Sequence, residues 1–127
     1  MSSMEKLELA NTEDTPYLLL DKENNKFEIS GRSLPEDAFE FYSPIHEWLK
    51  SYVADANPST ELVMNLDYFN SSSARSIVEM LFILEKITET GKEVKVTWLY
   101  QEEDDVMKSR GEEIQSVVEL PFEIKTV

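Results

Sequence analysis

The sequence predicts a small α/β domain in which helices pack on a mixed β-sheet of about four to five strands. The chain has 127 residues, of which 41% are hydrophobic, and this length suits one compact domain with a buried core. Some segments alternate apolar and polar residues as strands do, whereas others repeat apolar residues at helical spacing. One helical segment joins two strand-like runs, an order that favours a parallel crossover.

The N-terminal part predicts a polar segment followed by a β-hairpin. Residues 1–15 are polar and acidic and are expected to form a flexible or loosely packed segment. Residues 17–21 and 27–30 are short apolar or alternating runs. The connection Glu23-Asn24-Asn25-Lys26 carries asparagines that suit a tight turn, so the two runs predict a β-hairpin.

The next segment contains two helix-start signals. Ser33 is followed three residues later by Glu36, which is the spacing of a capping box. Ser43-Pro44 marks a second, stronger start, and Pro44 is expected to break a helix that begins earlier. From Ile45 onward, apolar residues fall at helical spacing until Asn57-Pro58 ends the helix.

The central segment reads strand, turn, helix, strand. Residues 61–69 predict a largely buried strand, and Asn70-Ser71-Ser72-Ser73 is expected to be the turn that ends it. Apolar residues then repeat at helical spacing until Gly91. Residues 93–100 place Val, Val, Trp and Tyr on one parity and predict the next strand.

The C-terminal part predicts a weak helix and an edge strand. The acidic run of residues 102–105 favours a solvated helix start, with divalent-cation binding as the alternative. Gly111 costs the helix roughly 1 kcal/mol relative to alanine, which favours a short or mobile helix. Residues 122–125 predict a last edge strand.

Composition excludes several classes of function. The net charge of −14 disfavours binding to nucleic acid or anionic membranes, and the absence of cysteine excludes disulfides and thiolate chemistry. No signal core or membrane-length apolar run is present, so we expect a cytoplasmic protein. His46 is the only histidine and lacks a catalytic partner, and no phosphate loop or dinucleotide fingerprint occurs. We therefore predict no cofactor, no metal and no enzymatic activity.

The serines at residues 71–73 are the strongest candidate site. A hydroxyl at a helix N-terminus lies beside unpaired amides and the positive end of the helix dipole, which also accommodate a phosphate. Phosphorylation of Ser71, Ser72 or Ser73 is therefore compatible with the fold, although ordinary helix capping explains serines there equally well. Arg75 is a candidate to pair with a phosphate on Ser71 or Ser72, and the alternative is an unpaired, solvated arginine on the helix surface.

The chain resembles the SiaC family of bacterial regulatory phosphoproteins, which are STAS-like proteins related in fold to anti-sigma factor antagonists. The resemblance spans nearly the whole chain and rests on the order and spacing of several short stretches. These are Leu34–Asp37, Glu40–Ile45, Trp48–Tyr52, Leu66–Ser73, Gly91–Val94, Trp98–Asp105 and Pro121-Phe122.

The resemblance implies a partner-switching circuit. In the family this turn typically reads Asn-Thr-Ser-Ser and its threonine is phosphorylated, which implies Ser71 here, with Ser72 as the alternative. The implied partners are a Ser/Thr kinase, a PP2C-type phosphatase and an effector bound by the unphosphorylated form. The best-known effector is a diguanylate cyclase, so the implied output is cyclic di-GMP signalling and biofilm behaviour.

These expectations define one switch surface and two rival functions, of which the second and weaker is a small hydrolase or metal-dependent enzyme that uses the carboxylates near Asp104. The switch surface comprises Asp67, Asn70, Ser71, Ser72, Ser73 and Arg75, with Lys92 as a further interface candidate. A phosphate on Ser71 would add charge beside Asp67 and disfavour docking of a partner. The chief rival is an acidic interaction adaptor without phosphoregulation, in which the serines only cap the helix.

Overall fold

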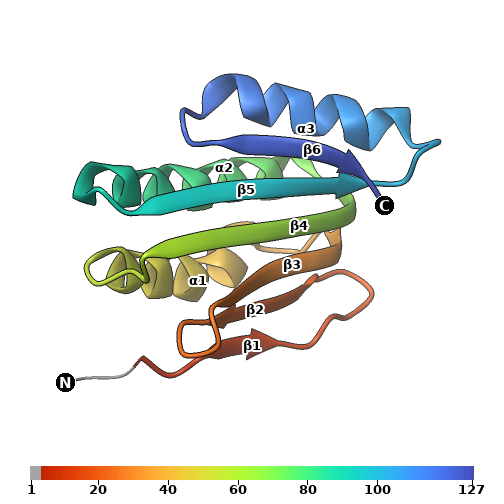
Figure 1. Ribbon diagram of the computed structural model, residues 1–127. Coiled ribbons are helices and arrows are strands. Elements are labelled where there is room, and N and C mark those ends of the chain that lie inside the picture. Colours follow the sequence, from red (N-terminus) through yellow and green to blue (C-terminus); the bar gives the residue numbers. More distant parts are fainter. Residues whose placement is uncertain (1–3) are drawn as a thin grey trace.

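The computed structural model describes residues 4–127, and the first three residues of the polar N-terminal segment lie outside the described part. Within it, six strands form one mixed sheet that carries helices (Figure 1). The strands are β1 (Leu7–Leu9), β2 (Tyr17–Asp21), β3 (Lys26–Ser33), β4 (Ser59–Phe69), β5 (Glu93–Tyr100) and β6 (Phe122–Thr126). The helices are α1 (Ala38–Val53), α2 (Ser71–Glu85), the 3₁₀ helix η1 (Lys86–Thr90) and α3 (Asp105–Val117).

The predicted α/β class is confirmed, with one strand more than expected. The sheet order is β1-β2-β3-β4-β5-β6, so every strand lies beside its neighbour in sequence. Strands β1 to β3 pair antiparallel, which confirms the hairpin of β2 and β3, and Asn25 adopts a positive φ of 54° in its turn. Strands β3 to β6 pair parallel, as predicted for the crossover from β4 to β5.

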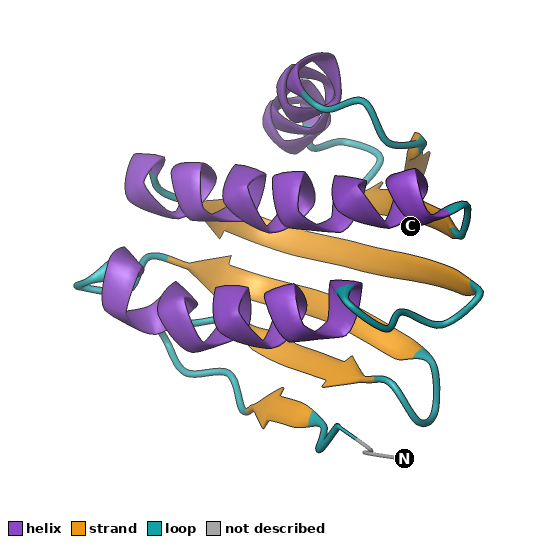
Figure 2. Ribbon diagram, turned by 90° about the vertical axis from the view of Figure 1, so that its left-hand side faces the viewer, coloured by secondary structure: helices purple, strands orange, loops and turns teal. Residues whose placement is uncertain are grey.

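The three α-helices cover one face of the sheet. Figure 2 shows α1 and α2 side by side in front of the sheet, with α3 above them. Alternate strand residues point toward the helices, and Met64, Val96 and Trp98 are among those almost fully buried. Since each parallel connection passes through a helix on this face, the N-termini of the helices follow the C-terminal ends of β3, β4 and β5.

Gly111 is required for α3 to pack on the sheet. A Cβ atom at this position would lie 2.6 Å from both Cδ1 and Nε1 of the Trp98 indole. The indole Nε1 donates a hydrogen bond to the Met107 carbonyl at 3.0 Å, so the ring is fixed against the helix backbone. The helix runs without interruption across Gly111. Gly111 therefore does not shorten the helix as expected, because close packing outweighs the weak helix propensity of glycine.

Helix α1 also departs from the expected start. It begins at Ala38 and its cap is Asp37, whose Oδ1 accepts the Glu40 amide at 3.0 Å. Pro44 lies inside the helix, so the predicted break there was wrong, and Ser33 ends β3 instead of capping a helix. Buried side chains before and after Pro44 keep α1 against the core, and this packing outweighs the lost amide donor.

Replacing Pro44 with alanine should raise the free energy of unfolding by about 1 kcal/mol. Alanine restores an amide donor to the carbonyl four residues earlier, and the proline penalty inside a helix is up to ~3 kcal/mol. Part of that gain is offset because proline also restricts the unfolded chain. Urea unfolding of the two proteins measures the difference, and a loss of stability would contradict a helix strained at Pro44.

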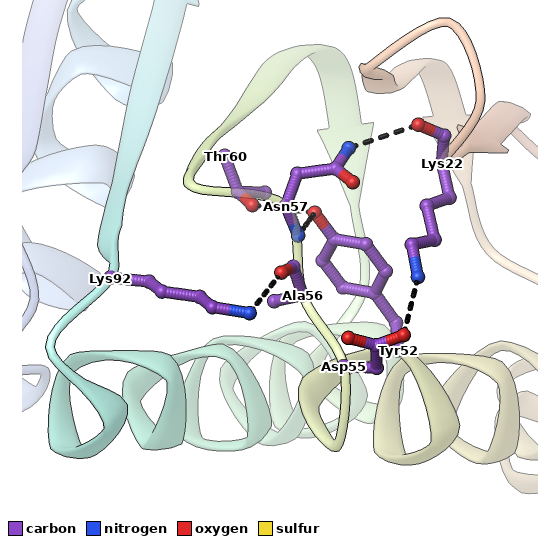
Figure 3. Close-up of polar contacts among 7 residues, drawn as sticks. All are labelled: Lys22, Tyr52, Asp55, Ala56, Asn57, Thr60 and Lys92. Atoms are coloured by element: carbon purple, nitrogen blue, oxygen red, sulfur yellow. Dashed lines mark hydrogen bonds and ion pairs between the residues drawn. The ribbon is translucent and has the colours of Figure 1, made fainter.

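The end of the sheet where β4 begins is fastened by a polar network (Figure 3). The buried Tyr52 hydroxyl bonds to Thr60 Oγ1 at 2.7 Å and accepts the Asn57 amide at 3.1 Å. Asn57 Nδ2 donates to the Lys22 carbonyl, and Lys92 Nζ donates to the Ala56 carbonyl at 2.5 Å. The network fixes the loop between α1 and β4 against β2 and β5.

The same network lowers the pKa of one carboxyl group and fixes the position of Lys92. The hydrogen bond and charge of Lys22, with Nζ 3.1 Å from Oδ2, lower the pKa of Asp55. Lys92 precedes β5, whose first residue pairs with Ser59 at the start of β4. Strand β4 spans roughly 35 Å, so Lys92 lies at the end of the sheet remote from Ser71.

Candidate functional site

A β-bulge shapes the chain just before the predicted switch turn. Gly31 pairs with Leu66 and Arg32 pairs with Tyr68, which leaves Asp67 as an extra residue in β4. Gly31 has a φ of 98°, which only glycine adopts readily. The bulge reverses the alternation of β4, and an exposed Asp67 precedes the turn into α2.

Asn70, and none of the serines, is the N-cap of α2. Its Oδ1 accepts the Ser73 amide at 2.9 Å, and its own amide donates to the Ser33 carbonyl at 3.1 Å. The predicted turn of residues 70–73 is therefore the cap and first turn of the helix. The amides of Ser71 and Ser72 occupy helix positions that have no intrahelical acceptor.

The three serines differ sharply in exposure. Ser71 and Ser72 are exposed, whereas Ser73 is fully buried. Ser71 and Ser72 are therefore accessible from solvent in the folded chain, whereas Ser73 is not.

A buried hydroxyl chain fastens the base of this turn. Ser33 Oγ donates to Ser73 Oγ at 2.9 Å and lies 2.6 Å from the Tyr42 hydroxyl. These residues come from β3, α1 and α2, so the chain joins the three elements that meet at the turn. Burial raises the pKa of Tyr42 to about 12, while the hydrogen bonds from both serines act in the opposite direction.

Replacing Tyr42 with phenylalanine should cost about 1 kcal/mol of stability at pH 7, because it removes one buried hydrogen bond. An unfolded tyrosine titrates near pH 10, below the folded pKa of about 12. The stabilisation by neutral Tyr42 is thus complete below pH 10 and is lost as pH rises toward 12. The deficit of the variant should therefore shrink between pH 7 and 10.5 in urea unfolding, whereas exposed Tyr68→Phe should show neither effect.

A surface depression of about 500 Å³ lies between the first turns of α1 and α2. Ser71, Ser72 and Arg75 line it from α2, and Asp37 and Phe39 are among the residues that line it from α1. Phe39 is 81% exposed, which is unusual for a phenylalanine in a folded domain. Sequence reasoning missed Phe39. The expected break at Pro44 placed Phe39 outside the main helix, whereas in the structure it lies in the first turn of α1, beside the serines.

The arginines gather around the same turn. The chain has three, Arg32, Arg75 and Arg110. Arg32 adjoins the residue that accepts the Asn70 amide, Arg75 lines the depression, and the Arg110 guanidinium lies 4.9 Å from the centre of the Phe69 ring. Among residues 4–127 every ion pair uses a lysine, so none of the three guanidinium groups lies within ion-pair distance of a carboxylate. Charges of both signs surround the turn, because the carboxylates of Glu36 and Asp37 line the same depression and Asp67 is exposed just before it.

The other candidate residues serve the fold. His46 Nε2 lies 2.9 Å from the Ser76 carbonyl, and its ring stacks on Tyr42, so His46 joins α1 to α2. In the acidic run, Asp104 caps α3 by accepting the Met107 amide at 3.1 Å, as the interpretation of a helix start predicted. Within the described part of the chain, no three metal-ligating side chains converge. No helix of residues 4–127 combines the length and hydropathy needed to cross a bilayer.

The mixed six-stranded sheet with three α-helices on one face defines an α/β domain, and its two exposed serines lie at the start of α2. The chain belongs to the SiaC family of regulatory phosphoproteins, whose family model matches residues 9–127. This membership agrees with the resemblance found in the sequence.

Individual relatives agree with the family over nearly the full length. An uncharacterised protein of Pseudomonas aeruginosa (strain UCBPP-PA14) is 27% identical over 122 residues, which cover 96% of this chain and 97% of that protein. The structure of SiaC of Pseudomonas aeruginosa superposes with a TM-score of 0.88 at 27% identity and covers 98% of this chain and all of its own. A complex of the diguanylate cyclase SiaD with its activator SiaC, from the same organism, also matches with a TM-score of 0.88 at 26% identity, over 95% of this chain and 99% of that one.

Proposed function

We propose that this chain is a cytoplasmic partner-switching protein, without enzymatic activity, whose effector binding is controlled by phosphorylation of Ser71. The unphosphorylated form binds and regulates the effector, a Ser/Thr kinase modifies Ser71 and thereby releases it, and a PP2C-type phosphatase resets the switch. Ser72 is the alternative acceptor.

One observation carries the proposal: two exposed serine hydroxyls lie at the start of α2, and capping does not use them. Asn70 accepts the Ser73 amide and so supplies the cap that the rival interpretation assigns to the serines. The helix N-terminus and the nearby guanidinium groups offer a phosphate favourable electrostatics. A phosphate on Ser71 is therefore compatible with an intact fold.

The effector class follows from the relatives. SiaC of Pseudomonas aeruginosa is described as the activator of the diguanylate cyclase SiaD, with which it forms a complex. We infer that a diguanylate cyclase is the effector of this chain too, so that the switch regulates cyclic di-GMP and biofilm behaviour.

The release mechanism is electrostatic. A phosphoserine carries about 1.5 to 2 negative charges at neutral pH and three strong acceptor oxygens. On Ser71 it lies one helical turn before Arg75, so it engages this guanidinium in place of the effector. It also adds charge close to the exposed Asp67, and both effects weaken docking.

The decisive experiment is mass spectrometry of the protein isolated from its native cells. We expect one phosphate on the peptide containing residues 70–73, assigned to Ser71 by fragmentation, and we expect a PP2C-type phosphatase to remove it. Purified phosphorylated and dephosphorylated forms are then compared for binding to the diguanylate cyclases of the same organism.

The outcome separates the switch from the adaptor. Lack of this phosphate in all growth conditions, together with binding that is equal in both forms and weakens steeply with salt, would establish the acidic adaptor instead. A phosphate found only on Ser72 would move the switch by one residue and keep the mechanism.

A further inference from the structure

Strand β6 forms one edge of the sheet. In the part of the chain that the structure describes, β5 pairs with one side of β6 and no strand pairs with the other (Figure 1). Helix α3 lies on the face of the sheet over β5, where the helix backbone at Gly111 meets the Trp98 indole. The outer side of β6 is therefore open to a further strand.

The direction of the backbone groups in β6 follows from the hydrogen bonds at its two ends. The Val96 amide donates to the Pro121 carbonyl, and the Val127 amide donates to the Tyr100 carbonyl, both at 2.9 Å. In a parallel strand the amide and carbonyl of one residue point to the same side, and the side alternates from residue to residue. Odd-numbered residues of this segment therefore bond to β5. The groups that point outward belong to Phe122, Ile124 and Thr126.

One of the outward carbonyls already has a side-chain partner. Gln115 Nε2 of α3 donates to the Phe122 carbonyl at 2.9 Å. A carbonyl oxygen has two lone pairs, so this bond leaves Phe122 able to accept a second donor. The contact also shows that donors reach the outward carbonyls of β6.

The side chains of β6 are self-complementary when the strand is copied in the antiparallel direction. Phe122 and Ile124 are partly buried, whereas Glu123 and Lys125 are about half exposed, with Oε1 of the carboxylate 3.6 Å from Nζ. An antiparallel copy centred on Ile124 places Glu123 of each copy opposite Lys125 of the other. Opposite charges in facing positions stabilise a strand pair.

We propose that the outer edge of β6 binds β6 of a second copy of this chain, antiparallel and centred on Ile124. In this register Ile124 faces its equivalent, and Phe122 faces Thr126 of the second copy. These residues all point their backbone groups outward, so each facing pair exchanges two hydrogen bonds. The surface is separated by β5 from β4 and the serine turn, and the inference goes beyond the proposed switch.

Charge fixes the register of this pairing. Sliding one strand by two residues keeps the outward backbone groups facing one another, but it places two copies of Glu123 or two copies of Lys125 opposite each other. Like charges in directly facing positions are unfavourable, so these registers are disfavoured. A lysine on an edge strand normally discourages pairing. In this strand the glutamate two residues earlier gives the lysine a partner in a single register.

The resulting dimer is closed and free of helix clashes. A two-fold axis perpendicular to the sheet relates the copies, so each edge meets only its equivalent. The two β5 strands are then separated by three strand spacings, about 14 Å. The α3 helices above them clear one another, because packed helices approach to about 8–10 Å. The axis also reverses the strand direction, so the serine turns of the two copies lie at opposite ends of the joined sheet.

The acidic charge of the chain does not prevent this contact at physiological ionic strength. Each copy carries a net charge of −14, which repels the other copy at long range. Charges farther apart than a Debye length of about 8 Å are largely screened, whereas facing side chains in a strand pair lie about 5 Å apart. Screening therefore weakens the repulsion more than it weakens the facing pairs. Since two short strands form a small interface, we expect a weak, reversible dimer.

Sedimentation equilibrium of the full-length protein at physiological salt tests the association. We expect a monomer–dimer equilibrium whose dimer fraction rises through the high micromolar range. Residue-resolved amide exchange locates the contact: the amides of Ile124 and Thr126 should exchange more slowly as the concentration rises. Those of Glu123 and Lys125, which bond to β5, should not respond. A chain that stays monomeric up to about 1 mM, or new protection elsewhere instead, would overturn the proposal.

Charge complementation tests the facing pairs directly. Glu123→Lys and Lys125→Glu each place like charges in facing positions, so each variant alone should dimerise at least about tenfold more weakly. Mixed in equal amounts they should form a heterodimer, because two ammonium groups of one then face two carboxylates of the other. Glu89→Lys and Lys86→Glu change the net charge by the same amounts at exposed positions of η1 and should dimerise like the wild type. Failure of the first mixture to associate would overturn the pairing.

Proline at position 126 isolates the backbone contribution. Thr126→Pro removes an outward amide and leaves the hydrogen bonds to β5 in place, so it should weaken dimerisation about tenfold or more while the monomer stays folded. Thr126→Val keeps the amide and should dimerise like the wild type. Circular dichroism verifies the fold of each variant. Equal dimerisation of the folded proline and valine variants would show that β6 does not pair and would overturn the proposal.

Discussion

Gly111→Ala is expected to lower the free energy of unfolding by about 1–3 kcal/mol, the usual range for overpacking a core. Alanine normally stabilises a helix by about 1 kcal/mol relative to glycine, so the predicted sign is the reverse of the propensity effect. The reason is steric, because the new methyl group would lie 2.6 Å from two atoms of the buried Trp98 ring. Urea unfolding at pH 7 measures the difference.

Two further variants make this test specific. Ser109→Ala on the exposed side of the same helix should change stability by no more than about 0.5 kcal/mol. In a Trp98→Leu background the clashing ring atoms are absent, so the added cost of Gly111→Ala should largely disappear in a double-mutant cycle. Equal costs in both backgrounds would contradict the assignment of the clash to Trp98.

The helices and strands that the sequence predicts correctly are those in which the spacing of apolar residues matches the pattern of burial in the structure. The strand at residues 93–100 matches β5 in full, and the helix after Asn70 and the edge strand at the C-terminus are also confirmed. In β5 one parity faces the helices, so alternation alone identifies the strand. Strand β1 has three residues that only complete the sheet edge, and so short a run carries no clear pattern.

The errors have a common cause, since each concerns a residue whose local preference is overridden by distant contacts. Pro44 stays helical because its buried neighbours pack α1 against the core. Gly111 stays helical because the Trp98 indole packs directly on the helix backbone at this position. Ser33 has the spacing of a cap, but its hydroxyl instead meets Tyr42 and Ser73 in the core. Sequence spacing does not encode these contacts.

The candidate site was predictable in position but not in composition. Hydroxyl residues between a strand and a helix indicated the turn, and the structure brings Asn70, Ser71, Ser72 and Arg75 together there. The sequence does not show that Ser73 is buried while Ser71 and Ser72 are exposed, because this difference depends on how β3 and α1 pack together beneath the turn. The contribution of Phe39 also depends on how the helices are placed relative to one another.

Ser71→Asp and Ser71→Glu are expected to bind the effector at least about tenfold more weakly than the wild type, and Ser71→Ala is expected to bind it constitutively. A carboxylate at this position imitates part of the phosphate charge beside Arg75, whereas alanine removes the acceptor hydroxyl and leaves the docking surface intact. Calorimetric titration with the purified diguanylate cyclase measures the affinities, and urea unfolding verifies that each variant is folded.

The control for net charge is Ser51→Asp, which adds one negative charge at an exposed position of α1 near its C-terminal end. It should retain wild-type affinity, because charges separated by more than a Debye length of about 8 Å are screened at physiological ionic strength. A loss equal to that of Ser71→Asp would mean that overall charge, and not the turn, governs binding. Equal affinity of the alanine, aspartate and glutamate forms at Ser71 would instead remove Ser71 from the switch, and a parallel series at Ser72 decides whether its neighbour takes that role.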